Sequence, residues 1–149
     1  MATITTFLGG QTATTACITA ESLGKAYVLR NRLDFSDTNT SASDVVQALA
    51  IPAMTYVLDV VTRVVTAEGG TLTATVGEVG AANAWDNSVD LNASADTITQ
   101  SVNGTDAHSA ANARGYVYTT AKTIDLTMSA NAADTAVLDI FAICFDLNI

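Results

Sequence analysis

The feature that most constrains this chain is a period-two alternation of apolar and polar residues. It recurs in residues 26–35, 45–51, 56–66, 72–76 and 123–128, and no stretch of a dozen residues keeps the 3.6-residue period of a helix. The chain also has 26 Ala and 23 Thr but only 3 Glu and 2 Lys, so it lacks the charged residues that normally cover exposed helices. The sequence therefore disfavours a helical fold and predicts an all-β protein.

The first predicted strand, residues 26–35, has one apolar and one charged face. The apolar face carries Tyr27, Leu29, Leu33 and Phe35, and the opposite face carries Arg30, Arg32 and Asp34. The next strand, residues 45–51, ends at Pro52, which has no N–H group to donate to a neighbouring strand. Both patterns are typical of strands with one face in a core.

Two hairpins are predicted. Residues 56–66 lead through Glu68-Gly69-Gly70, whose glycines permit the positive φ of a tight reversal, into residues 72–76. Residues 116–120 lead in the same way into residues 123–128, where polar Thr123, Asp125 and Thr127 are expected to point outward. Residues 78–96 alternate poorly and are rich in Asn, Asp and Gly, which predicts a long loop anchored by Trp85, Val89 and Leu91. Ile98 and Val102 indicate a short strand.

The last segment, residues 135–149, is apolar on both faces except at Asp139 and Asp146. This pattern predicts a central strand, or a strand that a neighbouring subunit covers. The core of a single domain needs only one of these two apolar faces, so we expect a homotrimer that buries the other. The candidate interface residues are Val137, Phe141, Ile143 and Phe145.

Eight or nine strands in a single domain are the pattern of an antiparallel β-sandwich. The chain has 149 residues and no internal linker, so residues 26–149 are expected to form that sandwich. Residues 1–25 are small, Thr-rich and interrupted by glycines, which predicts an extended N-terminal arm. No apolar run reaches the length of a membrane span, and no signal peptide precedes the domain, so we expect no membrane partner.

Charge is unevenly distributed along the chain. The formal net charge is -9, which argues against nucleic-acid binding through a basic surface. Residues 1–63 carry four basic and five acidic residues, net -1, whereas residues 64–149 carry two basic and ten acidic residues, net -8. Lys25, Arg30 and Arg32 follow the predicted arm closely, which fits either a solvated strand face or contact with an acidic protein surface.

Catalytic and metal sites are not predicted. Asp106, His108 and Ser109 are the residue types of a catalytic triad, but triad members converge from separate elements rather than from one loop. Asp86, Asp90, Asp96 and Asp106 match no calcium-loop spacing, and the single His disfavours a His-based metal centre. Cys17 and Cys144 form no C-x-x-C pair and are expected to be buried thiols, with a bridge between them left open. We predict no cofactor and no enzymatic activity.

Residues 33–77 resemble a recurrent pattern in small structural proteins of tailed bacteriophages. The matching pieces are Asp44-Val45-Val46 before Ile51-Pro52-Ala53, then Val57-Leu58-Asp59-Val60, then Thr66-Ala67-Glu68-Gly69-Gly70. Residues 131–147, NAADTAVLDIFAICFDL, resemble the closing strand of the same proteins. The chain departs from the pattern at Met54, where a glycine often follows the Pro-turn, which affects the turn geometry rather than the fold.

The resemblance implies a virion protein of the capsid decoration, or cement, type. Such a protein has a jelly-roll-like sandwich, forms a trimer, and binds the major capsid protein on the outer surface of the head after synthesis in the host cytoplasm. The capsid-contact candidates are then Ile4, Phe7, Leu8, Ile18, Lys25, Arg30 and Arg32. The alternative is a phage tail or fibre module that binds a host-surface receptor, with a sugar-stacking surface built from Trp85, Tyr116 and Tyr118.

Overall fold

The computed structural model describes residues 3–4, 26–37, 39–101, 104, 108, 115–129 and 131–148. The described residues form strands and connecting segments without a helix, so none of them could cross a membrane as a helix. The strands are β1 (Thr3–Ile4), β2 (Ala26–Asp34), β3 (Val45–Ile51), β4 (Thr55–Thr66), β5 (Thr73–Glu78), β6 (Ala81–Asp90), β7 (Ile98–Gln100), β8 (Tyr116–Tyr118), β9 (Lys122–Met128) and β10 (Val137–Asp146).

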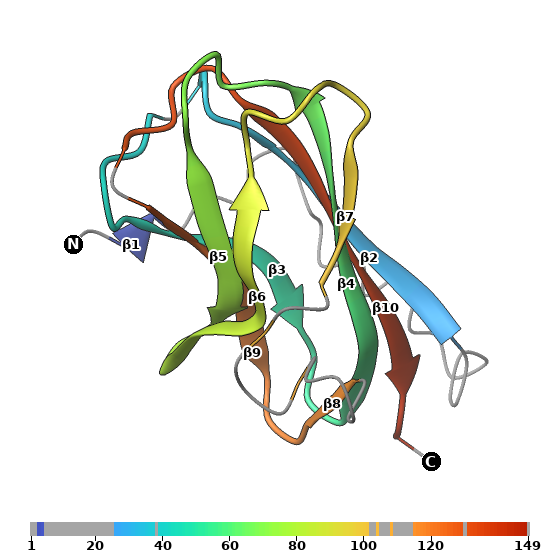
Figure 1. Ribbon diagram of the computed structural model, residues 1–149. Coiled ribbons are helices and arrows are strands. Elements are labelled where there is room, and N and C mark those ends of the chain that lie inside the picture. The colour runs from blue at the N-terminus through green and yellow to red at the C-terminus, as the bar shows by residue number, and fades with distance from the viewer. Residues whose placement is uncertain are drawn as a thin grey trace.

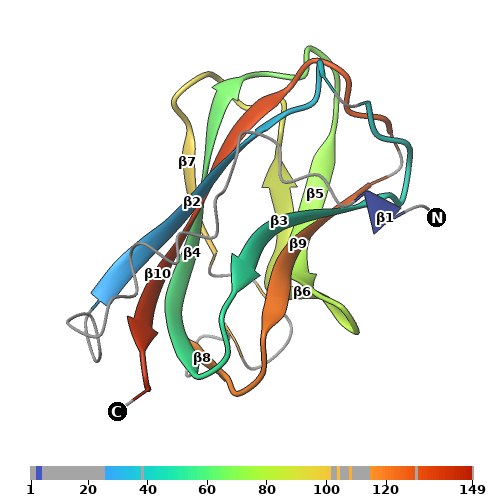
Figure 2. The same ribbon diagram turned by 180° about the vertical axis from the view of Figure 1, so that it is seen from behind.

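Two sheets pack face to face, as Figures 1 and 2 show from opposite sides. Sheet A has the order β1-β3-β9-β5-β6, and sheet B has the order β2-β10-β4-β7, with β8 also paired to β4. All pairings are antiparallel except the short contact between β1 and β3. The four-stranded orders 2-10-4-7 and 3-9-5-6 are those of a jelly roll, so the predicted all-β, jelly-roll-like sandwich is confirmed.

The core lies between the two sheets. Strand β10 runs through the middle of sheet B, between β2 and β4, which confirms the prediction of a central strand. Alternate residues of β10 face the core and are fully buried, as are the inward residues of β9 across from them. These buried residues are Leu138, Ile140, Ala142 and Cys144 on β10 and Ile124, Leu126 and Met128 on β9.

Both predicted hairpins are wrong. Strand β4 pairs with β10, β7 and β8 in sheet B, whereas β5 pairs with β6 and β9 in sheet A, so the chain crosses between the sheets at residues 67–72. In the same way β8 belongs to sheet B and β9 to sheet A. Two turn glycines mark a reversal of the chain, but they do not determine whether the next strand joins the same sheet or the opposite one.

The connection after β4 is held by one carboxylate. Glu68 accepts hydrogen bonds from the backbone N–H groups of Asp134, Thr135 and Ala136, at 3.1, 3.2 and 2.7 Å. Its own N–H group donates to the carbonyl of Leu91 at 3.1 Å. The Glu68-Gly69-Gly70 segment therefore ties together the connections that lead into β5 and β10.

The predicted loop over residues 78–96 is also wrong, because residues 81–90 form strand β6, which pairs with β5. The register of this pair shifts twice, between Ala74 and Val76 and between Val76 and Glu78, and these irregularities break the alternation in the sequence. Trp85, Val89 and Leu91 are buried, so their role as anchors is as expected.

Candidate interaction surface

The outer face of sheet B carries an unusual mixture of aromatic, aliphatic and ion-paired side chains. Residues directly opposite one another in a sheet share a face, so the register identifies its members. On one side of β10, Ile143 lies opposite Val28, Phe141 opposite Arg30 and Asp139 opposite Arg32. On the other side, Phe145 lies opposite Tyr56, Phe141 opposite Val61 and Asp139 opposite Arg63.

Asp139 is the centre of an ion-pair network on this face. Its side chain is completely buried, although it points away from the core. Arg32 donates to its carboxylate in a two-pronged arrangement, through Nε at 2.8 Å and Nη2 at 2.9 Å. Arg30 Nη2 donates to both carboxylate oxygens at 3.4 and 3.3 Å, and Arg63 Nη1 lies 3.6 Å away. The hydrogen bond from Arg32, then the charges of Arg30 and Arg32, lower the pKa of Asp139 against the opposing effect of burial.

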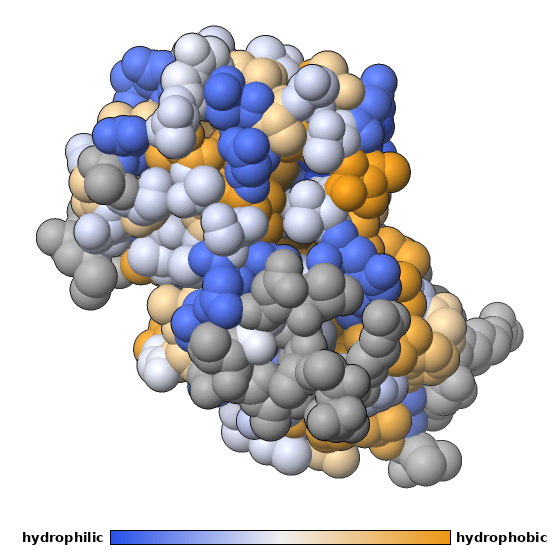
Figure 3. Space-filling view, viewed as in Figure 1, coloured by the Kyte–Doolittle hydropathy of each residue, from blue (hydrophilic) through white to orange (hydrophobic). Residues whose placement is uncertain are grey.

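The rest of the face is mostly apolar, although Asp59 lies opposite Ile143 and accepts a hydrogen bond from Gln100 of β7. Val28 is 58% exposed and Ile98 on β7 is 66% exposed, while the aromatic side chains of Phe141 and Phe145 are half-buried. The guanidinium of Arg30 lies over the Phe141 ring at 5.5 Å, and Tyr56 contacts Phe145 with ring centroids 5.9 Å apart. Figure 3 shows apolar surface along the right-hand flank, the side on which Figure 1 draws β7, β2 and β10.

The structure brings two predicted sets of residues onto this one face. The interface candidates Val137, Phe141, Ile143 and Phe145 alternate along β10, and the capsid-contact candidates Arg30 and Arg32 lie on the adjacent strand β2. Asp139 separates Val137 from the other three interface candidates. Ile4 lies in β1, where its backbone pairs with Val46 of β3 at the edge of sheet A. Phe7, Leu8, Ile18 and Lys25 lie outside the described residues.

Sequence reasoning missed the roles of Asp139 and Arg63. The signal for Asp139 was present, since it is a charge within an apolar strand, and a buried charge requires a partner. The partners could not be identified, because Arg63 comes from a strand 76 positions earlier whose pairing with β10 is set by the sheet topology.

The residue types considered for chemistry are dispersed. Among the described residues, no group of three or more His, Cys, Asp or Glu side chains could hold a metal ion. Asp86 is buried, Asp90 and Asp96 are exposed, and Asp106 lies outside the described residues, as does Ser109. Cys144 is a free thiol, and burial raises its pKa to about 12, whereas Cys17 lies outside the described residues.

His108 belongs to an aromatic cluster. Its ring stacks on Tyr116 at 3.6 Å and meets Trp85 edge-on at 5.4 Å. Trp85 is 1% exposed and donates from Nε1 to the Tyr118 hydroxyl at 3.0 Å, and Tyr118 is equally buried. Of the three rings considered for sugar stacking, only Tyr116 is exposed, at 37%. The cluster is therefore mainly part of the core.

Chains in three bacteriophage capsids have a similar structure. One is in the acid-stable capsid of Helicobacter pylori bacteriophage KHP30, with a TM-score of 0.60, 17% identity, and coverage of 83% of this chain and 89% of that chain. Another is in the capsid asymmetric unit of cyanophage Pam1, with a TM-score of 0.62, 16% identity, and coverage of 83% and 86%. A third is in the capsid of Ralstonia phage GP4, with a TM-score of 0.60, 15% identity, and coverage of 83% and 86%.

No protein-family model and no curated protein sequence matches this chain. The likeness to the three capsid chains extends over most of both partners in each comparison, although fewer than one residue in five is identical. What it shows is the fold: this chain has the β-sandwich that also occurs in the capsids of these three phages.

Proposed function

We propose that this chain is a decoration, or cement, protein that binds the outer surface of a bacteriophage head and stabilises the head. The observation that carries the proposal is the shared fold with chains in three phage capsids, of which this chain covers 86% to 89%. A match of that extent is to a whole capsid chain rather than to a small domain within one. The sequence resemblance to phage structural proteins in residues 33–77 and 131–147 supports the same function independently.

The outer face of sheet B supports an assembly role. A domain of this size completes its core with the inward faces of its two sheets, so the exposed apolar side chains on this outer face have no use in folding alone. The contact partners are the major capsid protein and other copies of this chain. We propose that Ile143 and Phe145 meet neighbouring copies in a trimer, and that the end of the face with Arg30 and Arg32 lies toward the shell together with the arm, residues 1–25.

The net charge supports an outer position. A chain of net charge -9 inside the head would be repelled by packaged DNA with its high phosphate density. The outer surface of the shell imposes no such cost. Because the surplus negative charge comes from residues 64–149, net -8, that part of the protein is expected to face solvent.

The experiment is binding of the purified protein to phage heads that lack this protein. We expect saturable binding at a fixed number of copies per shell and an increase in the temperature at which the shells break. The double variant Phe141→Ser with Ile143→Ser should lose binding while it keeps the fold. The matched control is Met54→Ser, because Met54 is a 40% exposed apolar residue in the turn between β3 and β4, outside the outer face of sheet B. Wild-type protein that fails to bind, or that binds only isolated tails, would contradict the proposal.

A further inference from the structure

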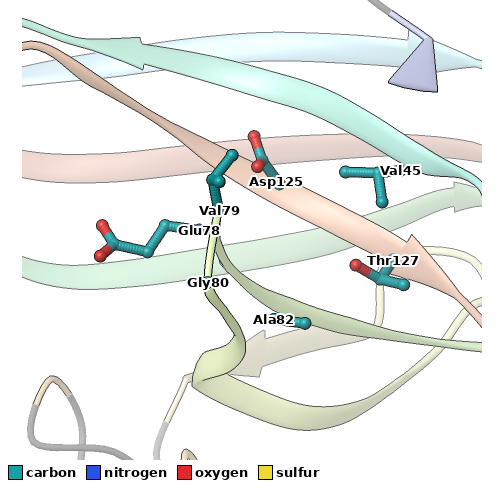
Figure 4. A pocket seen from close by; sticks show the side chains of 7 residues that line it. All are labelled: Val45, Glu78, Val79, Gly80, Ala82, Asp125 and Thr127. Carbon is teal, nitrogen blue, oxygen red and sulfur yellow. The ribbon is translucent and has the colours of Figure 1, made fainter.

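A pocket of about 270 Å³ lies on the outer face of sheet A, away from the surface described above (Figure 4). The turn between β5 and β6 forms one side, and strands β9 and β3 form the other. Its walls are mostly apolar, with two carboxylates, one from Glu78 on β5 and one from Asp125 on β9, and the hydroxyl of Thr127 on β9. The lining residues are Val45, Glu78, Val79, Gly80, Ala82, Asp125 and Thr127.

Asp125 is buried here even though it lies on the outer face of its sheet. The expectation that it is exposed is therefore wrong, and the reason is its cross-strand partner Gly77. A Cβ atom on Gly77 would come within 2.1 Å of the carbonyl oxygen of Ala81 and 2.4 Å of the carbonyl carbon of Ala82. Only glycine permits this close approach, which lets the backbone after β5 fold back over the sheet and cover the carboxylate.

The buried carboxylate of Asp125 forms no ion pair with a described residue. Asp125 is 2% exposed, and neither of its oxygens accepts a hydrogen bond of normal length from a described residue. Burial raises the pKa of Asp125 and the neighbouring Glu78 adds to the increase, whereas the Thr123 hydroxyl and the charge of Lys122 act in the opposite direction. The ammonium of Lys122 is paired with Glu78 instead, at 3.5 Å. Burial of an unpaired carboxylate is unfavourable, and a cation that reaches it supplies the missing partner, less the cost of its own desolvation.

We propose that this pocket receives a lysine or arginine side chain of a partner protein, with the cationic head beside Asp125. Such side chains join a charged head to an aliphatic stem, which matches a carboxylate below apolar walls formed by Val45, Val79 and Ala82. Asp125 and Val79 both line the pocket, and their side chains adjoin in the view of Figure 4. Since Val79 is 69% exposed, its side chain can turn aside without disturbing the core.

The pocket is tested with n-butylguanidinium chloride, which carries a cationic head on a short stem. The full-length protein is labelled at its methyl groups, and the NMR shifts of Val45, Val79 and Ala82 are followed as the probe is added. We expect saturable shifts in the wild type and at least tenfold weaker binding in Asp125→Asn. Asp90→Asn is the matched control, because Asp90 is exposed on the same sheet and should bind the probe like the wild type.

Further measurements distinguish a site for a cationic side chain from a purely apolar pocket and from a metal site. Thr127→Leu narrows the pocket without changing Asp125 and should also weaken binding, which covers the case in which Asp125→Asn does not fold. The inference is overturned if neutral n-butylurea binds as well as the cation, if Asp125→Asn binds normally, or if calcium chloride shifts the same methyl groups at lower concentration. Shell binding is a separate readout, so an empty pocket would leave the proposed capsid role intact, and failure to bind shells would leave the pocket result intact.

Discussion

The ion-pair network of Asp139 gives the most specific prediction about stability. Asp139→Asn preserves the size of the side chain but removes the charge that Arg30, Arg32 and Arg63 surround. Hydrogen bonds to charged groups stabilise proteins by about 1.5–3 kcal/mol, whereas fully exposed ion pairs contribute about 0.2–1 kcal/mol. The Asp139 side chain is 0% exposed, but the side chains of Arg30, Arg32 and Arg63 are 54%, 48% and 39% exposed. Water can therefore solvate the arginine charges in Asp139→Asn, which reduces the loss of stability. We therefore expect a destabilisation of about 1–2 kcal/mol at pH 7.

The effect of pH has a defined sign. The folded-state pKa of Asp139 is lowered, chiefly by the hydrogen bond from Arg32, so the carboxylate stabilises the fold above its unfolded-state pKa. This contribution is lost as the pH falls through the folded-state pKa, which lies below the ordinary aspartate value of 3.8. The difference in the free energy of unfolding between the wild type and Asp139→Asn should therefore have its full value at pH 7 and decrease toward zero in strong acid.

The assay is urea unfolding at fixed protein concentration, at pH 7 and at pH 2.5. For a slope of about 2 kcal/mol per molar urea, the predicted loss shifts the midpoint by about 0.5–1 M at pH 7. Asp37→Asn is the control, because Asp37 lies exposed in the turn after β2 and should change the midpoint little at either pH. A midpoint for Asp139→Asn within about 0.1 M of the wild type at pH 7, or a difference that persists unchanged in acid, would refute the reasoning.

Three further predictions concern the core and the β5–β6 turn. Gly77→Ala should destabilise the fold by more than about 2 kcal/mol in thermal unfolding, because the added Cβ would lie 2.1 Å from a backbone oxygen. The control Gly70→Ala, whose Cβ would have no atom within 4 Å, should be neutral or slightly stabilising in the same assay. Trp85→Phe and Tyr118→Phe should each lower the free energy of unfolding by about 1–3 kcal/mol. The double variant should lose less than the sum of the two single losses, because both substitutions remove the same 3.0 Å hydrogen bond. Cys144, with its pKa raised to about 12 by burial, should resist alkylation until the protein unfolds, which mass spectrometry of modified peptides measures directly. Rapid alkylation of Cys144 in the native protein would contradict the prediction for this thiol. Losses of stability that add up fully in the double variant of Trp85 and Tyr118 would contradict the prediction for the shared hydrogen bond.

The positions of strands could be predicted from the sequence far better than their partners. The strand expected at residues 45–51 is β3, and it ends at Pro52 as the missing N–H group requires. Alternation is a local property that follows from burial of one face, so it is visible in the residues themselves. Pairing is not local: Gly69 and Gly70 occupy the turn where expected, yet the strands they join belong to different sheets of the jelly roll.

The candidate surface was predictable in its members but not in its arrangement. Phe141 and Ile143 are recognisable as surplus apolar residues, and Arg30 and Arg32 as charged residues of one strand face, without any knowledge of topology. That Arg30 lies opposite Phe141 follows only from the register of β2 on β10. The burial of Asp125 required a different kind of information, because it depends on a close backbone approach over Gly77 in another strand.

The most direct test of the proposed function is a cryo-electron microscopy reconstruction of the intact virion at a resolution that separates strands. A decoration protein predicts copies of this β-sandwich on the outside of the shell, in groups of three. It also predicts that the outer face of sheet B, with Asp139 and Phe141, is covered by neighbouring copies and by the shell protein. A reconstruction that finds the chain forming the shell itself, lining its inner surface, or confined to the tail would contradict the proposed function.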